Sequence, residues 1–108
     1  MKNKFYSHIL TIEPVHNVLS SLDIEEDEKK ELLDILQSHI HVTVIDIILS
    51  ELDEGKKKEF LHLVGVKEDN DGAWNFVLAN IEKGEDKVKE AIDRIVADFV
   101  NDLEKHSF

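Results

Sequence analysis

The chain has 108 residues, of which 42% are hydrophobic and 34% are charged, so it should fold as one domain spanning residues 1–108. One Pro, four Gly and an aromatic content of 6% argue against a small all-β fold, which needs frequent turn residues and strand-forming side chains. The net charge of -11 disfavours direct binding to nucleic acid, and the absence of Cys excludes disulfides, thiolate nucleophiles and Cys-based metal sites.

The first predicted elements are short. Residues 4–12 place apolar side chains on one side at helical spacing. Pro14 is expected in the first turn of a helix capped by Thr11 or Glu13, because the missing N–H of Pro costs nothing there. Asp23 is expected to end this helix in the left-handed conformation, followed by an apolar residue that packs back on the last turn.

A second helix is predicted to begin in residues 25–31, because the helix dipole favours acidic side chains in a first turn. Residues 40–49 follow and contain many β-branched side chains, which on propensity alone favour a strand. We nevertheless predict a helix there, because Val44, Ile48 and Leu52 recur every four residues and no turn signal separates this run from its neighbours.

Asp53 is a suitable N-cap for a helix over residues 54–64. Gly65 followed by Val66 predicts that this helix ends in a Schellman motif. Its expected buried face comprises Phe60, Leu61 and Val64.

Asp69, Asn70 or Asp71 can cap the next helix, which Gly84 interrupts. Its apolar face comprises Trp74, Val77, Leu78 and Ile81. The last helix, over residues 85–105, carries an apolar stripe of Val88, Ile92, Ile95, Phe99 and Leu103. We therefore predict an all-α fold, a compact bundle of five to six helices with a long amphipathic C-terminal helix.

Six His residues are the most unusual feature of the composition. Two Glu-x-x-His spacings occur, Glu13 with His16 and Glu59 with His62, but chance accounts for both, and the second pair faces away from the predicted core. His39 and His41 lie on different sides of a helix and cannot share a metal. We predict no metal site, and a His/Glu metal-binding protein is the weakest alternative.

No nucleophile elbow, Ser-x-x-Lys motif or Gly-rich phosphate loop is present in the sequence, so we predict neither an enzyme nor a cofactor. The basic run of residues 56–58 is expected to be a solvated helix face, and Trp74 to be part of the core. Glu13 interrupts any signal-like apolar stretch, and the run from Val42 to Leu49 is far shorter than a membrane span. We expect a cytoplasmic protein with no membrane span.

The stretch from His39 to Leu52, continuing into residues 56–61, resembles a group of short uncharacterised proteins from ultra-small candidate-phylum bacteria. The opening Phe5-Tyr6-Ser7-His8-Ile9 is also similar to these proteins. The resemblance implies a small, acidic, all-helical cytosolic protein, and it carries no catalytic motif.

These observations predict a non-enzymatic protein-binding or assembly module that contacts a protein partner or a second copy of itself. The expected interface residues are Val42, Val44, Ile45, Ile48, Leu49, Ile95, Phe99 and Leu103. The alternative is an acidic inhibitor or immunity-type protein that masks a basic surface with Glu25, Glu26, Asp27, Glu28 and Glu31. An acidic contact should weaken as ionic strength rises, whereas a hydrophobic seam should not.

Overall fold

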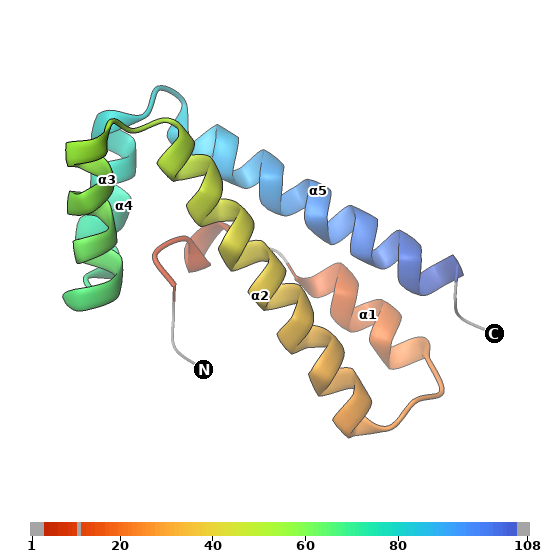
Figure 1. Cartoon of the computed structure of the whole chain (residues 1–108). Coiled ribbons are helices and arrows are strands. Elements are labelled where there is room, and N and C mark those ends of the chain that lie inside the picture. Colours follow the sequence, from red (N-terminus) through yellow and green to blue (C-terminus); the bar gives the residue numbers. More distant parts are fainter. Residues whose placement is uncertain (1–3, 11, 106–108) are drawn as a thin grey trace.

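The computed structural model describes residues 4–10 and 12–105, and within these ranges it contains helices and no strand. Five α-helices follow one another: α1 (Glu13–Ser21), α2 (Glu26–Ser50), α3 (Glu54–Leu61), α4 (Asn70–Asn80) and α5 (Gly84–Lys105) (Figure 1). A 3-10 turn, Ser7–Ile9, precedes α1, and a π-helical turn, His62–Val66, follows α3. The predicted all-α bundle with a long C-terminal helix is confirmed.

The longest element, α2, runs without a break through residues 40–49. The predicted helix is therefore correct there, and the strand that β-branched propensity favoured does not form. Four buried side chains, each one turn of helix from the next, line the inner side of α2: Leu36, Ile40, Val44 and Ile48. Burial of this stripe outweighs the small propensity cost of the β-branched residues.

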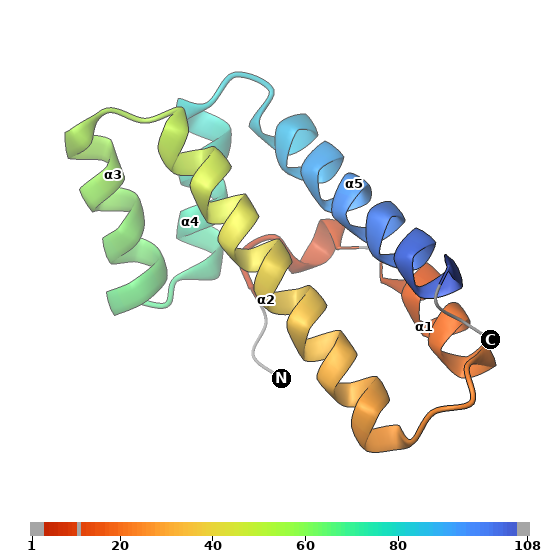
Figure 2. The ribbon, with the colours of Figure 1, turned by 45° about the vertical axis from the view of Figure 1, so that its right-hand side comes forward.

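The two long helices, α2 and α5, lie side by side in both views, and α1 packs along α5 (Figures 1 and 2). The helices α3 and α4 stand together at the opposite end of α2 from α1. The molecule measures 49 × 24 × 20 Å along its principal axes, so the bundle is elongated. An elongated bundle leaves one side of its long helices uncovered.

The helix α2 is also long and apolar enough, by length and composition, to cross a membrane. An 18-residue window in it has a mean hydropathy of 1.5, and only 22% of that window is buried. The high mean arises because apolar residues occur on both the inner and the outer side of the helix. A core helix of a soluble protein can meet the same criteria, so length and composition assign no location.

Aromatic side chains hold the α3–α4 end of the bundle to the N-terminal segment. The Phe5 ring packs edge-on against the rings of Tyr6 and Phe60, with centroids 5.1 and 5.5 Å apart. Phe5, Tyr6 and Phe60 are all buried. The N-terminal segment forms only a 3-10 turn, so the helical spacing predicted over residues 4–12 does not form a regular helix.

Two predicted caps are confirmed. The Asp53 side chain accepts a hydrogen bond from the Lys56 backbone N–H at 2.9 Å, and Asp69 accepts one from the Gly72 N–H at the same distance. The cap proposed for α1 is different, because Ile12 occupies that position without a side-chain bond and Glu13 is already helical. Thr11 lies outside the described residues.

The predicted left-handed end at Asp23 is wrong, because α1 ends at Ser21 and Leu22 is already extended. The predicted Schellman motif at Gly65 is wrong, because the φ of Gly65 is not positive. A π-helical turn carries the chain past Gly65, and Glu68 takes the left-handed conformation with φ 50°. The Asp69 N–H then donates to the Leu63 carbonyl at 2.9 Å, six residues back, which is one residue more than the long-range bond of a Schellman motif spans.

Two residues predicted on buried faces are instead exposed, Leu61 and Leu78. Leu61 is the last residue of α3, and Leu78 lies near the end of α4. The buried side chain of α3 is Phe60. The buried side chains of α4 are Ala73 and Val77, and Ile81 is buried directly after it. The buried stripe on each helix is therefore narrower than periodicity suggested.

Candidate functional site

The predicted interface residues of α2 divide into a buried set and a surface set. Val44 and Ile48 are completely buried, so they belong to the core and cannot meet a partner. That part of the predicted interface is wrong, because both residues lie on the inner stripe of α2. Val42 is 59% exposed, and Ile45 and Leu49 are partly buried against the core.

The terminal-helix residues in the predicted interface form an edge of the core. Ile95, Phe99 and Leu103 are partly buried and pack against it, while Val88 and Ile92 are buried. Val96 is also buried, although the sequence stripe did not include it. The interior therefore uses much of the apolar surface of α5, and its edge beside α2 stays partly accessible.

The outer side of α2 carries a second apolar stripe that the prediction included only in part. We call Ile35, Val42, Ile45 and Leu49 the outward seam. Ile35 is 61% exposed and was missed by the sequence analysis. The signal that could have found it is the seven-residue spacing of Ile35, Val42 and Leu49, which is the spacing of a helix-pairing seam.

A shallow groove of about 220 Å³ lies between α2 and α5 at the N-terminal end of this seam. Ile35, Leu36 and His39 line it from α2, and Ile95 and Phe99 line it from α5. The carboxylates of Asp98 and Asp102 also line the groove. The groove thus combines an apolar floor with an acidic edge.

Acidic side chains continue along the same side of the molecule. We call Glu28, Glu31, Asp46, Asp98 and Asp102 the acidic rim. At 100° per residue, Glu28, Glu31 and Asp46 share the outer side of α2 with Ile35 and Val42, and all five rim residues are exposed.

The other predicted acidic contacts, Glu25, Glu26 and Asp27, are exposed as well. Glu26 pairs with Lys29, with Oε1 and Nζ 3.2 Å apart. An exposed pair of this kind adds little to stability, so most of the acidic charge in this turn remains available to a partner.

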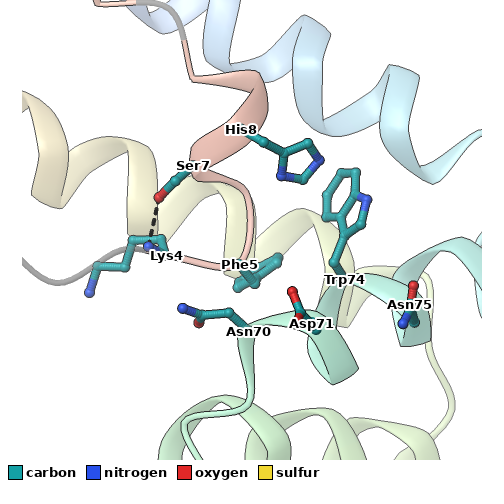
Figure 3. A pocket seen from close by; sticks show the side chains of 8 residues that line it. All are labelled: Lys4, Phe5, Ser7, His8, Asn70, Asp71, Trp74 and Asn75. Carbon is teal, nitrogen blue, oxygen red and sulfur yellow. Dashed lines mark hydrogen bonds between the residues drawn. The ribbon is translucent and has the colours of Figure 1, made fainter.

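A larger open cleft lies elsewhere, between the N-terminal segment and the start of α4 (Figure 3). It has a volume of about 840 Å³, with Trp74 and His8 on one wall and Asp71 at its centre. The rings of His8 and Trp74 meet edge-on, with centroids 4.6 Å apart. No sequence pattern indicated this cleft, because folding alone brings Lys4–His8 against α4.

Tyr6 and His41 form a contact behind this cleft, between the N-terminal segment and α2. The Tyr6 hydroxyl and His41 Nδ1 are 3.2 Å apart, and the O–H donates when Nδ1 carries no proton. Burial raises the pKa of Tyr6 to about 12. Burial, and to a smaller extent the Lys4 charge, lowers the pKa of His41 below its ordinary value. Both shifts favour the neutral pair.

The Glu-x-x-His pairs are not brought together. Glu13, His16, Glu59 and His62 are all exposed, and the two pairs lie on different helices, α1 and the α3 region. Across residues 4–10 and 12–105, no group of three or more His, Asp or Glu side chains could hold a metal.

Comparisons of the chain with protein families, curated proteins and solved structures find no match.

Proposed function

We propose that the protein is a non-enzymatic module that binds another protein through the outward seam of α2 and the neighbouring edge of α5. The observation that supports this proposal most directly is the two-sided apolar character of α2. Its inner stripe already supplies the core, yet Ile35 and Val42 remain 61% and 59% exposed on the opposite side. Exposed apolar residues that lie in register on one helix are typical of interaction surfaces.

The groove beside the seam favours contact with a folded segment of a partner. Apolar grooves between helices commonly receive an amphipathic helix, whose side chains enter at intervals of three or four residues. The spacing of Ile35, Val42, Ile45 and Leu49 is complementary to such a segment.

The alternative proposal is contact through the acidic first turn of α2 alone, residues 25–31. All five of its predicted contact residues are exposed, which supports this alternative. A purely acidic contact would tolerate polar substitution of the seam, whereas a seam contact would not.

The test is a paired capture experiment with the whole chain and the double variant Ile35→Gln/Val42→Gln. Gln is polar, uncharged and a good helix former, so the variant removes apolar surface with little effect on α2 itself. A matched control is Leu61→Gln/Val66→Gln, which removes two exposed apolar side chains elsewhere, 47% and 72% exposed.

The proposal predicts a protein that is retained by the wild type and by the control but is lost with the seam variant. That protein must then form a complex of fixed stoichiometry with the wild type when both are pure. If the seam variant and the control variant capture the same proteins, the seam is not the contact surface. If the whole chain instead floats with lipid vesicles in a manner that depends on Ile35 and Val42, the face serves a membrane and the proposal is wrong.

A further inference from the structure

We infer that the segment received by the outward seam is an amphipathic helix whose apolar stripe is flanked by Lys or Arg. This inference rests on the proposed function and adds the chemistry of the occupant to it.

The geometry indicates a helix. The outward seam from Ile35 to Leu49 lies on one straight, uninterrupted element, and at about 1.5 Å per residue it extends over roughly 21 Å. Its residues are seven, three and four positions apart in order, which matches the spacing of side chains on a facing helix. The groove between Ile35 and Phe99 offers a site for one apolar side chain at the end of this line.

The charge distribution indicates a cationic occupant. Residues 31–50 of α2 and 95–104 of α5 contain no Lys or Arg. The acidic rim borders the seam on the α2 side and the groove on the α5 side. Desolvating these carboxylates beside a neutral or acidic partner would be unfavourable, whereas Lys or Arg at the flanks of the partner helix would compensate the charge.

The same charges argue against a second copy of this chain. A two-fold dimer through the seam would place the acidic rim of one copy against the identical rim of the other. Each copy carries a net charge of -11, and neither residues 31–50 nor residues 95–104 contain a Lys or Arg that could compensate the acidic rim of the other copy. Like charges opposed in this way disfavour association.

The test measures binding of the untagged whole chain to three peptides of about 20 residues, which as helices would be about 30 Å long and would extend past both ends of the seam. The first has Leu at heptad spacing with Lys at the flanking positions. The second has the same Leu positions with Glu at the flanks. The third has the composition of the first in an order that destroys the apolar stripe.

We expect the first peptide to bind about tenfold more tightly than either of the others, since one well-buried apolar side chain or one compensated charge pair has an effect of this order. Raising the salt concentration from about 0.1 M to about 1 M should lower the affinity of the first peptide severalfold, because the electrostatic screening length falls from about 10 Å to about 3 Å. The variant Ile35→Gln/Val42→Gln should lose about tenfold in affinity, and Leu61→Gln/Val66→Gln should lose none. Asp98→Asn/Asp102→Asn should reduce the preference for Lys over Glu flanks.

Each contrary result has a separate meaning. Equal binding of the Lys and Glu peptides would overturn the cationic occupant while leaving the seam as a contact surface. Equal binding of the first and third peptides, insensitive to the seam variant, would overturn both this inference and the proposed function. If none of the three peptides binds, or if light scattering shows a stable dimer of the chain alone, the inference is overturned. The capture experiment above would still decide the proposed function.

Discussion

The contact between Gly84 and α4 gives the most precise stability prediction. Gly84 is buried at the first position of α5, directly after Lys83, whose φ is 56°. A Cβ placed on Gly84 would lie 2.8 Å from Val77 Cγ1, 3.2 Å from the Val77 carbonyl oxygen and 3.3 Å from Ile81 Cβ. Val77 is β-branched and completely buried, so it cannot rotate away, and the α4–α5 connection must move.

Overpacking of this kind lowers the free energy of unfolding by about 1–3 kcal/mol. Replacing Gly with Ala restores at most about 1 kcal/mol, because Ala reduces the conformational entropy of the unfolded chain. We therefore expect Gly84→Ala to lower the free energy of unfolding by about 1–2 kcal/mol. At about 4–8 °C per kcal/mol for a domain of this size, Tm should fall by roughly 4–16 °C. Thermal unfolding followed by circular dichroism measures this change.

The matched control is Gly65→Ala in the π-helical turn, where an added Cβ has no atom within 4 Å. This variant should be neutral, or stabilising by up to about 1 kcal/mol. If Gly84→Ala is as stable as the wild type while the control behaves as expected, then α4 and α5 do not approach each other as closely at Gly84 as the structure indicates.

Two other predictions concern local interactions. Because the pKa of His41 is lowered in the folded state, its contribution to stability is present above about pH 6.5 and is lost as the pH falls toward the folded pKa. Tm should therefore depend less on pH between about 7 and 5 in His41→Gln than in the wild type. The control is His39→Gln, which removes an exposed His. If Tm changes equally with pH in both variants, His41 is not responsible for the pH dependence. Asp69→Ala removes the cap of α4 and should lower the free energy of unfolding in urea by about 0.5–2 kcal/mol, whereas Asp71→Ala, two residues further on in the first turn and without that bond, should cost less. An equal loss in both would contradict the assigned cap.

Features that depend on neighbouring residues in the chain could be predicted from the sequence. Asp53 and Asp69 act as caps because a short acceptor side chain just before a helix reaches the free N–H groups two or three residues later. The beginning of α2 follows in the same way from its acidic first turn. These signals operate within one helical turn, and no distant part of the fold is needed to satisfy them.

Helix ends determined by packing could not be predicted. Gly65 had the local chemistry of a helix end, but the chain continues through the π-helical turn and reverses at Glu68. Val64 and Leu63 pack against the core on that turn, so their burial competes with the conformational preference of Gly65. The buried N-terminal residues Phe5 and Tyr6 likewise owe their position to contacts with distant helices.

The candidate site shows the same division. The sequence by itself predicted a helix over residues 40–49 and an interaction surface among its apolar residues, because both follow from the identity and spacing of the side chains. Only the tertiary structure decided which of them are buried. Packing beside α5 places Val44 and Ile48 in the core and leaves Val42 and Ile35 outside, since a helix in a two-layer arrangement can bury only the side that faces its neighbours.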